Sequence, residues 1–265
     1  MLPTEKEYIL WLTFLYGFGP VKGRNLLRKY GTAKVIFENQ HEIFEGMEEA
    51  AIRSSAAYDK ATNVIEMCQK QNVSIIGYGD IEYSNEWKDF NDFPLVLYKK
   101  GNLSLNGING IGIVGARRCS EFGKRSAIEL AENAVNEKRI VISGMAKGVD
   151  SYAHTSAIKS GGQTIAVLGN GVDICYPKEH RNLYEAICDN GAIVSEYAPG
   201  IIPQRYHFPR RNRIIAALSE EIYVIDAGGR SGTKSTVEAA VRYGRGVNVK
   251  SPRTQSYVPQ ILKNS

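Results

Sequence analysis

Apolar and polar positions follow two different patterns along the 265-residue chain. In the first 70 residues the apolar side chains recur at helical spacing. One such stretch, over 8–15, follows the plausible capping residue Thr4, another begins at Val21, and a third covers 57–71. The pattern therefore predicts a small all-α domain over residues 1–70.

From residue 71 onward, short apolar runs take over. The first two are strand-like runs at 73–76 and 95–98, with a predicted loop between them. Strands and helices then alternate. The strands are expected at 111–114, 140–142, 164–168, 192–194, 222–225 and 246–249, and the helices at 121–137, 151–160, 179–189, 212–218 and 233–242. Such alternation predicts right-handed βαβ units, and hence an α/β domain over 71–265 whose parallel sheet has helices on both faces.

The predicted turns after the strands are rich in glycine and polar residues. They cover 115–120, 143–150, 169–173, 195–197 and 227–233. Because the carboxyl ends of parallel strands meet at one edge of a sheet, these turns should share that edge with several helix N-termini. Free N–H groups and positive dipole ends there favour a phosphate group.

A basic run begins at Arg205 and ends in apolar Ile214 and Ile215. Four arginines and one histidine fall within its first nine residues, together with Tyr206 and Phe208. Arginine binds phosphate with two parallel hydrogen bonds, and aromatic faces stack on nucleic acid bases. The run therefore points to a polyanion, and to single-stranded nucleic acid in particular.

Composition narrows this picture only slightly. A net charge of +5 is compatible with a nucleic-acid partner but does not require one. The four cysteines have no CxxC spacing and no histidine pair beside them, so neither zinc nor a disulfide framework is expected, and the reducing cytoplasm is the expected location. The sequence shows no signal peptide and no apolar run of membrane-spanning length.

Two further features allow a functional and a structural interpretation. The spacing of Gly110, Gly112 and Gly115 fits a dinucleotide fingerprint, but the first two glycines precede or lie within the strand, so close sheet packing is the favoured explanation and no cofactor is expected. His154 lies on a face of small residues, where a structural histidine is favoured over a catalytic one.

Six segments together resemble the DNA-processing protein A (DprA/Smf) family, in order over about residues 72–249. They are 114–117, 143–154, 164–178, 195–196, 208–215 and 231–238. The resemblance implies an extended Rossmann-like core and a single-stranded DNA-binding protein. Such a protein protects incoming strands and loads a RecA-type recombinase onto them during natural transformation. It also implies a homodimer, preceded by a small helical domain.

In that family DNA contacts come from positions matched here by Arg117 and Lys178, and Arg211 and Arg213 line the same pocket. We add to these candidates the neighbouring residues Arg118, Gly144, Lys147, Asn212, Ser231, Gly232 and Thr233. Part of the arginine cluster is instead expected to be structural, with Asp150, Asp173 or Glu196 as partner.

Three expectations qualify the resemblance. The chain ends at Ser265, so the winged-helix domain that many members carry is not expected. The turn over 17–23 is similar to a helix-hairpin-helix (or SAM-like) element, but an ordinary interhelical turn is favoured.

The turn over 228–233 is also similar to that of lysine-decarboxylase-like (LOG) phosphoribohydrolases, the alternative nucleotide-binding function. Their glutamate three positions after the threonine is here Thr236, and the nearest glutamate is Glu238. No catalytic residue, and so no enzymatic activity, is therefore predicted.

Overall fold

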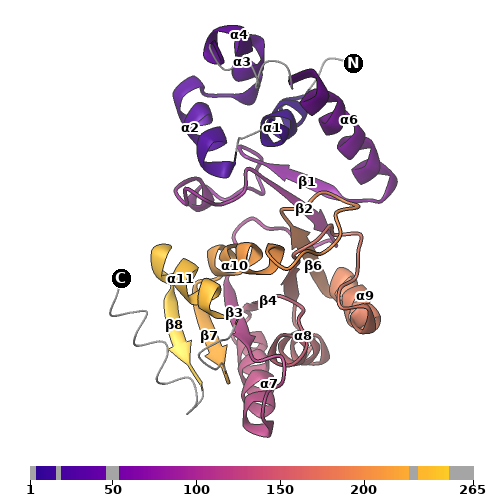
Figure 1. Cartoon of the computed structure of the whole chain (residues 1–265). Coiled ribbons are helices and arrows are strands. Elements are labelled where there is room, and N and C mark those ends of the chain that lie inside the picture. Colours follow the sequence, from indigo (N-terminus) through magenta and orange to yellow (C-terminus); the bar gives the residue numbers. More distant parts are fainter. Residues whose placement is uncertain (1–3, 16–18, 46–53, 227–231, 251–265) are drawn as a thin grey trace. The chain divides into compact units, whose positions relative to one another are not determined.

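A computed structural model describes residues 4–15, 19–45, 54–226 and 232–250 of the chain (Figure 1). Contacts divide the chain into two compact units, Met1–Tyr98 and Lys99–Ser265. This division does not test whether residues 1–70 form a domain of their own, so that boundary stays a prediction. None of the described helices is both long and apolar enough to cross a membrane.

The first unit is mainly helical. Its elements are α1 (Glu5–Phe14), α2 (Pro20–Tyr30), α3 (Ala33–Glu38), α4 (Gln40–Ile43), α6 (Ser54–Lys70), β1 (Ser74–Gly77) and β2 (Val96–Lys100), which ends just past the unit. Thr4 is the N-cap of α1, as predicted. Trp11 is fully buried, meets Phe37 edge to face at 5.0 Å between ring centroids, and donates from its indole N–H to Ser54 Oγ over 3.1 Å. These contacts hold α6 and α3 against α1.

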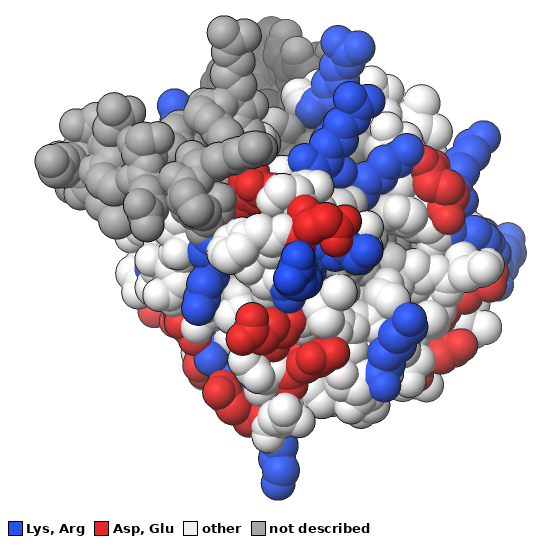
Figure 2. Space-filling view, turned by 90° about the horizontal axis from the view of Figure 1, so that it is seen from below, with Lys and Arg blue, Asp and Glu red and all other residues white. Residues whose placement is uncertain are grey.

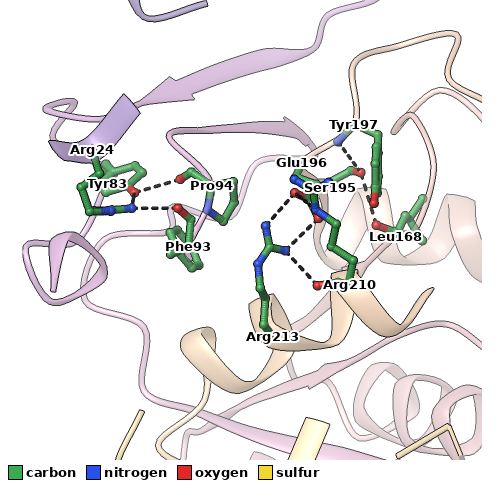
Figure 3. Close-up of polar contacts among 10 residues, drawn as sticks. All are labelled: Arg24, Tyr83, Phe93, Pro94, Leu168, Ser195, Glu196, Tyr197, Arg210 and Arg213. Carbon is green, nitrogen blue, oxygen red and sulfur yellow. Dashed lines mark hydrogen bonds and ion pairs between the residues drawn. The ribbon is translucent and has the colours of Figure 1, made fainter. Parts of the chain in front are cut away.

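The predicted loop between β1 and β2 is organised around Arg24 of α2, which is fully buried (Figure 3). Its Nη2 donates to the Tyr83 hydroxyl over 3.1 Å and to the Phe93 carbonyl over 2.8 Å. Its Nη1 donates to the Lys88 carbonyl over 2.9 Å. One guanidinium therefore satisfies acceptors of a segment whose only regular structure is the short turn η1 (Glu86–Lys88).

The second unit contains the predicted sheet. Within its described residues six strands pair in parallel, in the order β6-β5-β4-β3-β7-β8. They are β3 (Gly110–Gly115), β4 (Ile140–Ser143), β5 (Thr164–Val167), β6 (Gly191–Ser195), β7 (Glu221–Ile225) and β8 (Gly246–Val249). Helices cover both faces: α7 (Glu121–Asn136), α8 (Val149–Lys159) and α9 (Arg181–Asn190) pack on one, and α10 (His207–Leu218) and α11 (Lys234–Arg242) on the other. The Rossmann-like α/β fold is thus confirmed.

Glycines in β3 allow this sheet to pack closely. A Cβ added at Gly110 would lie 2.4 Å from Ile142 Cδ1, and one added at Gly112 would lie 2.3 Å from Ile222 Cδ1. A Cβ at either position would force the end of the neighbouring isoleucine side chain to move, so both glycines let the strands pack closely. This agrees with the packing explanation for the glycine spacing.

Helix α10 begins five residues before the predicted start, at His207 rather than Asn212. The predicted start was wrong, because Pro209 lies inside the helix, in its first turn. Proline is tolerated in a first helical turn, where its missing N–H has no intrahelical partner. As a result the whole cluster Arg210–Arg213 is helical, and its arginines point in directions set by helical geometry.

Candidate nucleic-acid interface

A cavity of about 780 Å³ lies at the carboxyl edge of the sheet in the second unit. The winding of the sheet reverses here, because β4 lies on one side of β3 and β7 on the other. Ligands of open α/β sheets bind at such a switch point. The turns after β3, β4 and β7 and the start of α10 form the wall, whose polar members include Arg117, Asp150, Arg205, Arg211, Asn212, Thr233 and Thr236.

The floor of the cavity is built around Arg211, which is 5% exposed. Its Nη1 donates to the Gly144 carbonyl over 2.9 Å and to the carbonyl of Val167, so it joins the ends of β4 and β5. A Cβ at Gly144 would lie 2.5 Å from Arg211 Nη2, which explains the glycine. The predicted residues Gly144 and Arg211 therefore meet, with Arg211 serving as a brace beneath the turn.

Asp150, at the start of α8, faces this brace. Its carboxylate accepts from the N–H groups of Gly144 and Ala146 over 3.1 and 3.3 Å. Burial raises the pKa of Asp150, against the opposing effects of Arg211 and these two N–H groups. Burial lowers the pKa of Arg211 to about 10, against the opposing effect of Asp150. The Arg211 guanidinium therefore stays charged near neutral pH, with its charge committed inside the protein.

Asn212 links the floor to the turn before α11. Its Oδ1 accepts from Arg211 Nε over 3.0 Å, and its Nδ2 donates to the Gly232 carbonyl over 3.0 Å and to Ser235 Oγ over 2.9 Å. The predicted residues Asn212, Gly232 and Thr233 all line the cavity. Ser231 lies outside the described residues.

Arg213 points elsewhere, to Glu196 just after β6 (Figure 3). Its two Nη atoms donate to the two carboxylate oxygens over 2.8 and 2.7 Å, and the side chains of Arg213 and Glu196 are only 8% and 5% exposed. Arg210, one helical turn earlier, places its Nε 3.4 Å from the same carboxylate but is half-exposed. Arg213 does not line the cavity. Its position fits the predicted alternative, a structural pair with Glu196. Contact between Arg213 and DNA stays a prediction.

The rim of the cavity carries exposed cations and an aromatic pair. Arg117 lies in the turn after β3, and its guanidinium carbon lies 6.0 Å from the ring centroid of Phe208. Phe208 packs against Tyr176 with 5.6 Å between centroids. Arg205 is exposed and also lines the cavity. Arg205 and Tyr176 were absent from the predicted site, although the basic run and the turn before Lys178 contained the signal.

The other predicted cations surround this rim without lining the cavity. Arg118, Lys147 and Lys178 are exposed, and each lies within two residues of a lining residue. Lys147 is paired with the Glu179 carboxylate. That hydrogen bond lowers the pKa of Glu179. The charge of Lys147 is thus partly neutralised.

The Glu238 carboxyl and the His154 imidazole, the two groups weighed for a catalytic role, both have partners within the fold. Glu238 Oε1 lies 3.6 Å from Lys234 Nζ on α11. Glu238 does not line the cavity, whereas Thr236 does. His154 is fully buried with Nδ1 2.7 Å from Thr164 Oγ1, and burial lowers its pKa to about 3, so it is neutral. In the portion of the chain described by the structure, no three His, Cys, Asp or Glu side chains gather as a metal site.

Charge is distributed unevenly over the face of the protein that Figure 2 draws. Lys and Arg side chains are most numerous toward the upper right of this view, and Asp and Glu side chains lie among them as well as lower on the face. The net charge of +5 is therefore less informative than the local arrangement of side chains.

The parallel sheet, with an arginine-lined cavity at its switch point, defines a Rossmann-like protein whose site suits an anionic ligand. Comparison with known proteins makes this specific. The model of the DNA recombination-mediator protein A family matches residues 74–261, and the chain belongs to that family.

Relatives and solved structures agree with this assignment. DNA processing protein DprA of Streptococcus pneumoniae is 41% identical over 165 residues, covering 62% of this chain and 58% of that protein. Protein Smf of Synechocystis is 33% identical over 261 residues, covering 93% of this chain and 65% of the relative. The chain thus spans about three-fifths of the length of these relatives.

Two solved structures share the fold. DprA from S. pneumoniae aligns with a TM-score of 0.70 at 29% identity, covering 99% of this chain and 88% of the other. DNA processing protein A from Helicobacter pylori, described for its single-stranded DNA binding mode, aligns with a TM-score of 0.62 at 26% identity, covering 72% of this chain and 96% of the other.

Proposed function

We propose that the cavity edge of the second unit binds single-stranded DNA and performs no chemistry on it. The observation that carries the proposal is the rim, where Arg117 and Arg205 stand beside the Tyr176–Phe208 pair. Among the residues that the structure describes, the ion pairs at this edge are Lys147–Glu179 and those of Glu196 with Arg210 and Arg213, and none of them includes Arg117 or Arg205. Both rim arginines are therefore available to phosphate groups.

A single strand suits this combination better than a duplex. Exposed bases of a single strand stack on aromatic rings, and cations follow its backbone. In a duplex the base faces are already stacked and out of reach. The similarity to the H. pylori protein supports the same choice.

The DNA-contacting set in this proposal is Arg117, Arg118, Gly144, Lys147, Lys178, Asn212, Ser231, Gly232 and Thr233, to which the structure adds Arg205. The predicted residues Arg211 and Arg213 are proposed to support this interface from inside the protein instead of contacting DNA. Family membership further supports delivery of the bound strand to a RecA-type recombinase, by a homodimer in the cytoplasm. In this proposal residues 1–70 form a separate helical domain.

The test is a fluorescence anisotropy titration with a labelled oligothymidylate and with a duplex of equal length. We expect tighter binding to the single strand, weak sequence preference, and affinity that falls with salt. Equal or tighter binding to the duplex contradicts the proposal. A parallel assay with nucleoside monophosphates checks for catalysis, and base release abolished by Glu238→Gln would support the phosphoribohydrolase alternative.

A further inference from the structure

Tyr206 is an aromatic side chain left largely in solvent, at 68% exposure. It directly precedes α10, immediately after Arg205, but it does not line the cavity. Burying an aromatic ring is favourable, so an exposed ring that neighbouring residues hold in place invites a functional explanation. The role of the cavity does not account for this ring.

The Tyr206 ring is held in place by contact with His207. Tyr206 meets His207 at 4.5 Å between centroids with the ring planes 80° apart. His207 is itself 5% exposed, stacks on Tyr197 at 3.9 Å, and has Nδ1 2.9 Å from the Gly169 carbonyl. An edge-to-face contact uses at most one face of Tyr206. The ring is therefore fixed while a face stays open to a ligand.

Cations lie on both sides of Tyr206 in the sequence. Arg205 lines the cavity wall. Arg210, one helical turn later, shares Glu196 with Arg213, whose two Nη atoms already engage both carboxylate oxygens. Two arginines facing one carboxylate leave a surplus positive charge, and the half-exposed Arg210 carries it at the surface.

We propose that Tyr206 is a second base-stacking platform outside the cavity, over which a bound single strand continues. This inference rests on the proposed function. Arg205 connects the two places, because it lines the cavity and adjoins Tyr206, and Arg210 supplies charge for the next phosphate. An open aromatic face, with one arginine directly before it in the sequence and another one helical turn after it, has the composition of a sequence-tolerant binding surface for single strands.

The same loop also exposes Ile201 and Ile202, at 40% and 61%. Apolar side chains beside an aromatic ring and arginines are found at protein interfaces as well. Continuity with the cavity through Arg205 favours the strand. Docking of a second copy of the chain is therefore treated as an outcome that overturns the proposal.

The experiment compares two strand lengths, about four and about ten nucleotides of oligothymidylate, with wild type and Tyr206→Ala. We expect Tyr206→Ala to weaken binding of the longer strand about tenfold and to leave the shorter strand almost unaffected. Tyr206→Trp should restore the longer strand's affinity, because it keeps a stacking ring. An abasic scan of the longer strand should show one position at which base removal costs wild type much more than Tyr206→Ala.

Ile81→Ala, which trims an exposed apolar side chain of the first unit, is the control and should change neither affinity. Equal losses for both lengths, or no loss for either, overturn the platform. A Tyr206→Ala variant that changes sedimentation but not binding assigns the ring to contact between copies and also overturns it. Failure of wild type to bind either strand contradicts the proposed function itself, so the two failures are distinguishable.

Discussion

The floor and the rim of the cavity use the same residue type for opposite purposes. On the floor, Arg211 is buried, donates to two strand-end carbonyls and faces Asp150. On the rim, Arg117 and Arg205 are exposed, and Arg117 lies over an aromatic ring. A buried cation needs internal partners to be tolerated, whereas an exposed cation beside a cavity can bind a ligand's anion. Burial and partners, not residue type, separate folding roles from binding roles here.

Helical geometry explains how one basic run supplies both. Arg210 and Arg213 are three residues apart, lie on one face of α10 and share Glu196. Arg211 is one position from Arg210, so it points in another direction, to the ends of β4 and β5. Arg205 precedes the helix and reaches the cavity. Two kinds of result would contradict this comparison. One is a rim variant that loses stability, and the other is a variant at a buried position that loses only DNA binding.

The largest loss of stability is expected for Arg213→Ala, because the buried Glu196 carboxylate then lacks the guanidinium that donates to both of its oxygens. Breaking a buried ion pair costs about 3–5 kcal/mol. Urea denaturation should show this loss in the free energy of unfolding. Arg210→Ala is the matched control: it removes the half-exposed partner of the same carboxylate and should cost about 1 kcal/mol or less. Equal losses in the two variants contradict the distinction.

Acidification should destabilise the protein through buried His154. Its pKa is about 3 in the folded chain and about 6.5 in the unfolded chain. As pH falls below 6.5 the unfolded chain takes up a proton that the folded chain refuses, so up to about 1.4 kcal/mol is lost per pH unit. Asp150 acts in the opposite direction, since its raised pKa lets the folded chain bind a proton before the unfolded chain does.

Urea denaturation at about pH 7.5 and about pH 5 measures this effect, with an expected difference of about 2 kcal/mol. His154→Gln should lose most of that pH dependence. A variant as sensitive to pH as wild type shows that another group is responsible.

At the rim, Arg117→Ala and Lys178→Ala should each weaken single-strand binding about tenfold, because each removes one phosphate partner. Both side chains are exposed, so the free energy of unfolding should stay within about 0.5 kcal/mol of wild type. Paired anisotropy titrations and urea denaturation curves check this. Wild-type affinity in both variants removes these residues from the interface.

The smallest effect is expected at the exposed pair of Lys147 and Glu179. Glu179→Gln frees Lys147 for phosphate and should tighten single-strand binding about two- to threefold, since exposed ion pairs are weak. Lys147→Gln should weaken binding by a similar factor. Weaker binding by Glu179→Gln shows that the carboxylate assists the interface instead of competing with phosphate.

The sequence predicts the sheet well because its strands are short apolar runs separated by glycine-rich turns. It misplaces the start of α10, because Pro209 is compatible with both a loop and a first helical turn. The sequence identifies the arginines of the basic run as candidates but does not show which of them bind a ligand and which are structural. The run itself contains no information on which carboxylate or carbonyl each arginine contacts. Glu196 and Val167 are brought to Arg213 and Arg211 only by the parallel sheet.

Residues at the rim were harder to predict than those on the floor. Phe208 is apparent from the basic run, but its partner Tyr176 comes from a turn more than thirty residues earlier. Arg205 lies outside the helical cluster and shares no spacing with it. Surface exposure decides its role, and exposure follows from the fold.

The most direct test of the central claim is the salt dependence of single-strand binding for wild type and Arg117→Ala. If the rim binds phosphate, log affinity falls linearly with log salt, and the slope is less steep in Arg117→Ala by about 0.7 per lost phosphate contact. Urea denaturation of the same samples should show unchanged stability. Salt-independent binding, or identical slopes with a destabilised variant, contradicts the assignment of binding to the rim and folding to the buried arginines.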